Sequence, residues 1–572
     1  MTSLAAEVSR VESLGWAEGI LRTLASDYRE RPRFSASWVV PTPPADAELA
    51  RSYAVEGSEV RLYRQRSSTE SFYFVAPWEY SLPAPQVRLV HLAREELKAS
   101  PPPAVRLERP DDVRAYVAKL GERILPRLAS EHGVSLGSDR ATAVATVRRL
   151  AAALAAYTAG LGVVEIPLRD PNVQDVYLDA PAGRTPLHVT IADLGDGLRQ
   201  RCVTNVYLTA PDAESLLARL RLESGRPFSE AMPVLETNFE AFRVRATAVG
   251  PPLSPDGLAV ALRRHSTDPW TLPRLVSCGA MTPLAAGLLS FLIDGRSTIL
   301  IAGGRGAGKS SLLGALLFEF PRSQRILTIE DTRELPTEDL QTLGFKAQSL
   351  FVRSSLGGHE MSADEALRVS LRLGESAIVL GEVRGQEART LYEAMRAGTA
   401  GSAVLGTIHG NSSRAVYERV VHDLGIPATS FAATDVVVVA GLVRPRGSQR
   451  TMRRVLEITD LKKTEGPGAF HPLLTYDTAM DALLVTGLAT SERIRAISDA
   501  WSLSFDEALE NIRVRAAVRS ALVERGRQNA EFLRPSWVAR ANAAYWGLVE
   551  EGREGPDLWD AWTSWFSGVS HA

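Results

Sequence analysis

The segment Gly303 to Ser310 limits the possible folds of this chain more than any other segment. It reads G-G-R-G-A-G-K-S and satisfies the pattern G-x-x-x-x-G-K-[ST]. An apolar run typical of a buried strand precedes it, and an apolar helical pattern follows it. Glycines let such a loop curl with its N–H groups pointing inward, and the positive end of the helix dipole lies at the same point. The segment therefore predicts a phosphate-binding loop in an α/β fold.

The residue types in this loop predict a nucleoside triphosphate with Mg²⁺ as ligands. We expect Lys309 to neutralise the β- and γ-phosphates and the hydroxyl of Ser310 to bind Mg²⁺. No N-K-x-D segment that would read a guanine base occurs in the chain, so ATP is the expected nucleotide. The other residues expected to contact it are Gly303, Gly304, Arg305, Gly306, Ala307, Gly308 and Ser311.

Buried apolar strands alternate with helical patterns from Met281 onward. Continuous apolar strands separated by helices indicate a parallel sheet that is covered on both faces. The whole chain predicts an α/β fold with a P-loop NTPase core, a mixed α+β second domain, a small N-terminal α/β domain and a helical C-terminal extension. The expected strands are 298–302, 325–329, 377–380, 403–408 and 436–440, and the expected domains are 1–130, 131–268, 269–460 and 461–572.

Acidic residues and a histidine follow three of these strands. Glu330 and Asp331 follow strand 325–329, and Glu382 follows strand 377–380. Ligands of doubly wound sheets bind beyond the carboxyl ends of the strands, so these carboxylates are candidates for holding the metal's waters and activating the attacking water. His409 follows strand 403–408 and is interpreted as a γ-phosphate contact, a contact to a neighbouring subunit, or a structural residue.

Composition limits the partners that the chain can take. The formal net charge is −2, and no basic run with interleaved aromatics occurs, so no nucleic acid is expected. The two cysteines, Cys202 and Cys278, allow neither a disulfide framework nor a four-cysteine zinc site, and each is expected to be a small buried side chain. No signal peptide is expected, and the longest apolar stretch, 281–304, is interrupted by charges.

The motifs together resemble the secretion ATPase superfamily of type II and type IV secretion and type IV pili, in its archaeal-like branch. The resemblance covers nearly the whole chain and is strongest over residues 160–460. It rests on four boxes in order and on upstream segments such as R-D-P-N-V-Q-D-V (169–176). The boxes are the phosphate loop, I-E-D-T-R-E-L (329–335), G-E-V-R-G-Q-E-A (381–388) and G-T-I-H-G-N-S (406–412).

The resemblance implies a role for each matching residue. Glu330 would orient or deprotonate the attacking water, Glu382 would support the water shell of the metal, and His409 would sense the γ-phosphate. Arg384 would help to organise the site. The arginines that would reach the nucleotide from the second domain, often from an adjacent subunit, are Arg226, Arg243 and Arg263. Their alternative interpretation is ordinary surface charge.

The resemblance also implies a RecA-like core, a homo-hexamer, and a place at the cytoplasmic face of a membrane beside a polytopic platform protein. Gly374 to Ser376 replace the usual R-P-D, which indicates a divergent branch. Two other hypotheses are a conjugation-type translocase of nucleic acid and a scaffold that binds ATP without hydrolysing it. Five tryptophans near the end indicate either the core of a helical cap or a partner surface: Trp537, Trp546, Trp559, Trp562 and Trp565.

Overall fold

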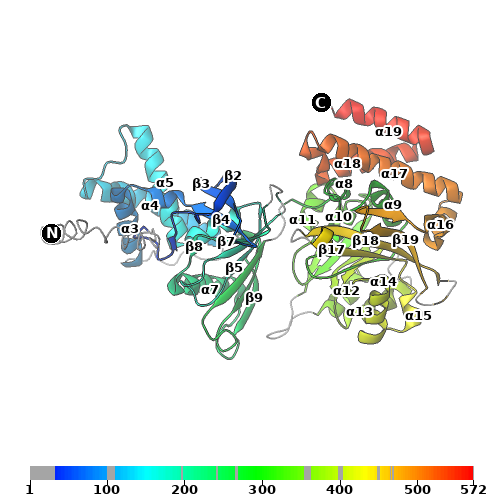
Figure 1. Cartoon of the computed structure of the whole chain (residues 1–572), viewed down its shortest axis with the longest axis horizontal. Helices are drawn as coiled ribbons and strands as arrows, with labels where there is room; N and C mark the ends of the chain where they lie inside the picture. The colour runs from blue at the N-terminus through cyan, green and yellow to red at the C-terminus, as the bar shows by residue number, and fades with distance from the viewer. Residues whose placement is uncertain are drawn as a thin grey trace. The chain divides into compact units, whose positions relative to one another are not determined.

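The computed structural model describes residues 32–99, 110–192, 194, 198–239, 242–264, 268–352, 362–396, 403–447, 451–463, 466 and 469–570. The chain divides into two units, residues 1–265 and residues 266–572 (Figure 1). Each unit has a sheet and a hydrophobic core of its own.

The first unit is a mixed α/β structure. Its strands are β1 (Trp38–Val39), β2 (Ala47–Val55), β3 (Ser58–Gln65), β4 (Ser71–Ala76), β5 (Val173–Leu178), β6 (His188–Ile191), β7 (Arg201–Thr204), β8 (Val206–Tyr207), β9 (Val234–Phe239), β10 (Val244–Val249) and β11 (Ala259–Arg264). Its helices are η1 (Trp78–Ser81), α3 (Ala84–Ala99), α4 (Pro110–Glu131), α5 (Arg140–Thr158), η2 (Gly162–Val164), α6 (Glu165–Arg169) and α7 (Ala210–Ser224).

One nine-stranded sheet runs through this unit in the order β2-β3-β4-β7-β6-β5-β11-β10-β9. Strand β4 pairs in parallel with β7, which joins the three strands before residue 130 to the six strands after residue 131. The boundary expected between residues 130 and 131 therefore does not separate two sheets. Sequence patterns did not indicate β2, β3 or β9. Strands β2 and β9 lie at the edges of the sheet and β3 lies next to β2, and all three carry charged, partly exposed residues.

Asp170, in the R-D-P segment, connects the two parts of this sheet. Its buried carboxylate accepts hydrogen bonds from the hydroxyls of Tyr53 (2.6 Å) and Tyr73 (2.7 Å) and from the backbone N–H of Asn172 (2.8 Å). Tyr53 lies on β2 and Tyr73 on β4, whereas Asp170 directly precedes β5. In this structure the segment therefore has a structural role: it ties the early strands to the later ones.

The second unit contains the phosphate loop. Its strands are β12 (Ile299–Gly303), β13 (Arg325–Glu330), β14 (Lys346–Phe351), β15 (Ala377–Val383), β16 (Val404–Ile408), β17 (Val436–Val443), β18 (Met452–Leu461), β19 (Phe470–Asp477) and β20 (Ala482–Val485). Its helices are α8 (Leu272–Ser277), α9 (Pro283–Asp294), α10 (Lys309–Leu317), α11 (Thr337–Thr342), α12 (Ala363–Ser370), α13 (Glu387–Arg396), α14 (Ser413–Glu418), the π-helix η4 (Arg419–Asp423), α15 (Ala428–Phe431), η5 (Pro445–Gly447), η7 (Leu488–Thr490), α16 (Glu492–Ala500), α17 (Phe505–Gly526), η8 (Ala530–Leu533), α18 (Pro535–Glu550) and α19 (Gly555–Val569).

The nine strands of this unit are ordered β14-β13-β15-β16-β12-β17-β18-β19-β20. The pairs from β14 to β17 are parallel, and the pairs from β17 to β20 are antiparallel. Figure 1 shows α9, α10, α17 and α18 on one face of the sheet and α12, α13, α14 and α15 on the other. Helices on both faces explain why the inner parallel strands β12, β16 and β17 are mostly apolar and buried, as expected from the sequence.

Successive residues of these strands belong to two separate cores. Ile299 and Ile301 of β12 pack with the helices of the first face, whereas Leu300 and Ala302 pack with those of the second. This alternation follows from the period of two in strand side chains. The fold is therefore the α/β class with a RecA-like core that the sequence predicts.

The C-terminal region differs from the expectation in one respect. Helices were expected from about residue 461, but residues 470–485 form β19 and β20, which extend the sheet, and the helices α16 to α19 follow. The adjacent residues Leu473 and Leu474 of β19 are both fully buried and belong to the hydrophobic core of this unit. Strand β19 pairs with β18. Without it, the backbone N–H and C=O groups along one side of β18 would have no strand partner.

The tryptophans of this region form the core of the helical cap. Trp562 is fully buried, and Trp537, Trp546, Trp559 and Trp565 pack against the same cluster while partly buried.

Among the cysteines, Cys202 is buried as expected, but Cys278 is exposed because it lies in the turn that ends α8. The expectation of a buried side chain is therefore wrong for Cys278.

None of the described helices alone has the length and apolar character needed to cross a membrane. One bent pair, Arg140–Thr158 with Gly162–Arg169, meets these requirements together by length and composition, with an angle of 98° between the two helices.

A buried ion pair joins the helical cap to the helix that follows the phosphate loop. Arg519 of α17 pairs with Glu319, which lies just beyond the end of α10, and both side chains are at most 2% exposed. Arg519 also donates to Ser290 Oγ (2.7 Å) and to Asn542 Oδ1 (2.9 Å). Removing one member of such a pair leaves a buried charge without its partner.

We expect Arg519→Ala to lower the free energy of unfolding by about 3 to 5 kcal/mol, because the carboxylate of Glu319 would remain buried without its cation. Urea denaturation followed by tryptophan fluorescence measures this change, since several tryptophans lie in the cap. The matched control is Arg513→Ala on the same helix, whose side chain is 65% exposed and which should cost under about 0.5 kcal/mol. Equal effects of the two variants would contradict the role of the buried pair.

Candidate functional site

The phosphate loop leaves the sheet from its centre. Strand β12 is fully buried, lies between β16 and β17, and ends at Gly303. A Cβ on Gly303 would lie 2.4 Å from the carbonyl oxygen of Ala440 on β17, so only glycine fits there. Gly308 has a φ of 92°, a left-handed conformation that side chains disfavour, and α10 begins at the next residue. The sequence therefore forms the loop because glycines occupy the positions that need them.

The loop offers donors to an anion. Gly308, at the N-cap of α10, has no side chain, so it provides no side-chain cap for the N–H groups of the first turn. Nothing lies within 4 Å of the position that a Cβ on Gly304 would take, which leaves open space at the loop. Lys309 Nζ donates to the carbonyl oxygens of Gly303 (3.1 Å) and Gly304 (3.2 Å). Burial lowers the pKa of Lys309, whereas the negative charges of Glu382 and Glu334 act against this shift.

Glu382 is the centre of a charged cluster beside the lysine. It lies where a bulge interrupts the pairing of β15 with β16, between Leu380 and Val383. Arg384 Nη2 donates to its Oε2, and Arg384 Nη1 donates to Asp331 Oδ2 (2.9 Å). His409 Nε2 lies 2.9 Å from Glu382 Oε1, a close ion-pair distance, although the angles are not those of a hydrogen bond.

The surroundings of Glu382 favour its charged form. Burial raises the pKa of its carboxyl, but the hydrogen bond from Arg384 and the charges of Arg384, His409 and Lys309 outweigh this, so the pKa lies below its usual range. A carboxylate that stays ionised next to a phosphate loop can hold the waters of a bound divalent cation. The structure thus brings together Lys309, Glu382, Arg384 and His409, which the sequence analysis proposed separately.

Glu330 has the opposite environment. Its side chain is 3% exposed, and its Oε1 accepts hydrogen bonds from the backbone N–H groups of Glu334 and Leu335, both at 2.9 Å. Burial raises the pKa of this carboxyl to about 7, against the effect of the two hydrogen bonds. Its Cγ lies 3.2 Å from the position that a Cβ on Gly381 would take, so Glu330 lies beside the β15 segment that carries Glu382.

The donor set fits Mg²⁺ bound together with a triphosphate. Ser310 lies in the first turn of α10, next to Lys309, and Glu382 lies close enough to the lysine to influence its pKa. No group of three or more His, Cys, Asp or Glu suited to a metal ion occurs among the described residues. Mg²⁺ needs no such group, because it keeps several waters and takes most of its other ligands from the phosphates.

Three predicted arginines lie in the first unit, and their approach to the nucleotide stays a prediction. Arg263 on β11 donates to Asp175 Oδ1 (2.8 Å), and Arg226 Nη1 donates to the carbonyl oxygen of Glu236 (2.9 Å). Arg243 precedes β10 and has a φ of 50°.

Two residues near the loop were missed by the sequence analysis. Glu334 lies in the acidic box, and its charge affects Lys309 and Arg384. Arg453 on β18 donates from Nε to the carbonyl oxygen of Gly306 (3.0 Å). A second glutamate in the box I-E-D-T-R-E-L is a usable signal for Glu334. No sequence signal indicated Arg453, because the strand that carries it was not predicted.

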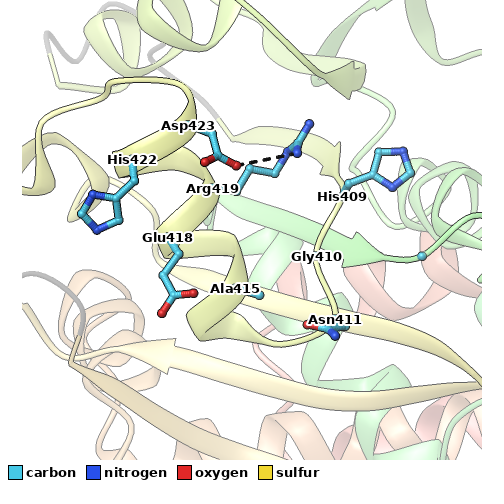
Figure 2. Close-up of a pocket in the computed structure, with 9 residues that line it drawn as sticks. His409, Gly410, Asn411, Ala415, Glu418, Arg419, His422 and Asp423 are labelled. Carbon is cyan, nitrogen blue, oxygen red and sulfur yellow. Dashed lines mark ion pairs between the residues drawn. The ribbon is translucent and has the colours of Figure 1, made fainter.

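An open groove of about 590 Å³ extends from the loop along α14 and the π-helix η4. Figure 2 shows His409, Gly410 and Asn411 on the loop after β16, and Arg419 paired with Asp423 on the helical turn beside it (4.0 Å). Because Gly304 and His409 both line it, the groove opens directly onto the phosphate loop. Its lining residues are Gly304, His409, Gly410, Asn411, Ala415, Glu418, Arg419, His422 and Asp423.

One protein family and several individual proteins are similar to this chain. Residues 209–493 match the family described as Type II/IV secretion system protein. A protein of Mycobacterium tuberculosis (strain CDC 1551 / Oshkosh) whose name assigns it to conjugal transfer is 31% identical over 316 residues, which cover 54% of this chain and 86% of that protein.

One further relative and one solved structure are similar to parts of this chain. The type IV secretion system protein PtlH of Bordetella pertussis (strain Tohama I) is 29% identical over 174 residues, 27% of this chain and 50% of that protein. The crystal structure of the VirB11 ATPase from the Brucella suis type IV secretion system matches 52% of this chain and 91% of that chain, at 24% identity and a TM-score of 0.26.

The raised pKa of Glu330 predicts a pH-dependent stability. Between about pH 4.5 and 7 the folded protein keeps this carboxyl protonated whereas the unfolded chain releases the proton, so the free energy of unfolding falls as pH rises through this range. The glutamine of Glu330→Gln cannot ionise. The free energy of unfolding of this variant should therefore rise relative to that of the wild type by about 2 to 3 kcal/mol between pH 5 and pH 8. Urea denaturation at several pH values measures the difference, with Glu393→Gln, 63% exposed, as the control. If the difference in free energy of unfolding between the wild type and Glu330→Gln is the same at every pH, the raised pKa of Glu330 is contradicted.

Proposed function

The chain belongs to the family of type II/IV secretion system proteins, and from this premise we propose that it is a motor that hydrolyses ATP with Mg²⁺. The observation that carries the proposal is the meeting of Lys309, Glu382 and His409 at the carboxyl ends of neighbouring parallel strands. A lysine on a glycine-rich loop with an ionised carboxylate beside it suits phosphoryl transfer, which depends on positioning and charge neutralisation.

Each residue of the site has a defined part in this proposal. The N–H groups of the loop and Lys309 hold the triphosphate, and Ser310 holds Mg²⁺. When bound, the metal neutralises charge on the β- and γ-phosphate oxygens. Glu382 positions the water shell, and Arg384 holds Glu382 in place through its hydrogen bond. His409, close to Glu382 and exposed to the groove, contacts the γ-phosphate.

Glu330 is the proposed general base. A pKa of about 7 suits a group that must accept a proton at neutral pH. Water attacks the γ-phosphorus as its proton passes to Glu330, and the bond to the β–γ bridging oxygen breaks to release ADP. In this structure the carboxylate is held by the N–H groups of Glu334 and Leu335. Activity therefore requires these two hydrogen bonds to break when nucleotide binds, which leaves the effect of burial on the pKa in place.

The working assembly that we propose is a homo-hexamer. Arg226, Arg243 and Arg263 would reach the γ-phosphate from an adjacent subunit. Charge-assisted hydrogen bonds to the γ-phosphate would bring neighbouring subunits together, and the loss of these bonds after hydrolysis would let the subunits separate again.

The mechanical output in this proposal is filament assembly or protein secretion. The hexamer would act at the cytoplasmic face of a membrane and pass its movement to a polytopic platform protein. Membership in the secretion family supports this output.

Variants of the phosphate loop and of the two glutamates test the enzymatic step. Lys309→Ala should weaken ATP binding at least tenfold, because the phosphates lose their cation. Glu330→Gln should keep ATP affinity and lower turnover about 10²- to 10⁴-fold, the usual contribution of a general base. Phosphate release with Mg-ATP and calorimetric titration measure the two effects, with Glu393→Gln as the control. If the wild type releases no phosphate even with its membrane partner, the chain is a scaffold that only binds ATP.

The arginines give a separate prediction. Arg226→Ala and Arg263→Ala should lower turnover strongly, by up to about 10³-fold, and leave ATP affinity nearly unchanged, because an arginine acting from a neighbouring subunit stabilises the transition state. Steady-state kinetics and calorimetry on the hexamer check this, with Arg201→Ala, exposed on β7, as the control. Wild-type turnover in both variants would remove these arginines from the mechanism.

A second candidate function is the translocation of nucleic acid during conjugation. One observation favours it, since the relative from Mycobacterium tuberculosis is named for conjugal transfer. The net charge of −2 argues against a strong electrostatic footprint on DNA. Adding single- and double-stranded DNA to the phosphate-release assay separates the two candidates: stimulation that falls steeply with salt would favour translocation.

A further inference from the structure

Two side chains border the phosphate loop from the neighbouring strands β17 and β18. Leu442 and Arg453 are directly paired across this antiparallel ladder, so their side chains lie on the same face. Leu442 Cδ1 lies 4.0 Å from the position that a Cβ on Gly306 would take, and Arg453 Cδ lies 3.5 Å from the corresponding position on Gly308. The end of this ladder therefore lies against the middle of the loop.

The two side chains differ in chemistry but share an unusual exposure. Leu442 is 46% exposed, whereas Leu300 of β12 and Leu461 of β18 are buried. Arg453 is exposed as well, and its Nε donates to the carbonyl oxygen of Gly306 at 3.0 Å, which fixes the guanidinium beside the loop. An apolar side chain and a planar cation next to each other form a surface suited to a flat aromatic ring.

The position of this surface along the loop indicates which part of a nucleotide would meet it. The backbone of such a loop cradles the α- and β-phosphates, and the lysine at its end reaches the β- and γ-phosphates. Gly306 and Gly308 belong to this backbone, so they lie at the α- and β-phosphates. Ribose and base are attached at the α-phosphate, so side chains that border these glycines are next to the nucleoside.

We propose that Leu442 and Arg453 form the nucleobase subsite of the nucleotide site, with the base lying against the leucine and the guanidinium plane. The inference rests on the proposed ATP-binding function and adds where the base binds and how it is recognised. Stacking contacts recognise the face of a purine rather than its hydrogen-bonding edge. Binding should therefore distinguish weakly between purines, with affinities for ATP and GTP within about threefold.

The test compares ATP with inorganic tripolyphosphate, which has the three phosphates but no base. Calorimetric titration of the full chain with each ligand gives the two dissociation constants. Arg453→Ala and Leu442→Ala should each weaken ATP binding about tenfold, because base contacts are lost, and should change tripolyphosphate binding less than twofold. Arg453→Lys should also weaken ATP binding, because it keeps the charge and loses the planar group.

The controls separate this inference from the proposed function. Arg513→Ala removes an exposed arginine from the cap and should leave both affinities unchanged. If Arg453→Ala weakens ATP and tripolyphosphate equally, Arg453 is a ligand of the phosphates or the loop, and the subsite is overturned. Unchanged ATP affinity in Arg453→Ala and Leu442→Ala would overturn it as well. A wild-type chain that binds no ATP would instead overturn the proposed function.

Discussion

The parallel pairing of β12 between β16 and β17 is the constraint on which the site depends. Pairing Ala302 with Ile408 places the start of the phosphate loop beside His409, and pairing Gly303 with Ala440 places it beside the β17–β18 ladder. Parallel strands bring all their carboxyl ends to one edge, so residues about 100 positions apart meet there. The close approach of Gly303 to the carbonyl oxygen of Ala440 leaves no room for a side chain at the turn.

The two glutamates at this edge have opposite electrostatic environments. Arg384, His409 and Lys309 surround Glu382 and favour its ionised form, whereas burial raises the pKa of Glu330 to about 7. Two carboxyls with separated pKa values can take two roles, one as a fixed negative charge and the other as a proton acceptor. The division of labour that we propose follows from their environments rather than from the residue type.

The helix α10 connects the site to the helical cap. Its first residue is Lys309, and just beyond its last turn Glu319 forms the buried pair with Arg519. Asn542 of α18 donates to the carbonyl oxygen of Phe318 at the same point (3.1 Å). The cap therefore holds the far end of the helix whose near end faces the phosphates. A helix fixed at its C-terminal end presents its first turn to the ligand with little freedom.

The sequence by itself determined the phosphate loop, the apolar parallel strands and the carboxylates at the strand ends, because each follows from local residue patterns. It indicated neither β2, β3, β9 and β14 nor β18 to β20, since strands with charged or partly exposed residues carry no continuous apolar run. Only the tertiary structure decided that Arg384 bridges Asp331 and Glu382 and that Arg453 and Leu442 border the loop. These contacts depend on strand order and register, which bring together residues that are far apart in the chain, and no local pattern records which strands become neighbours.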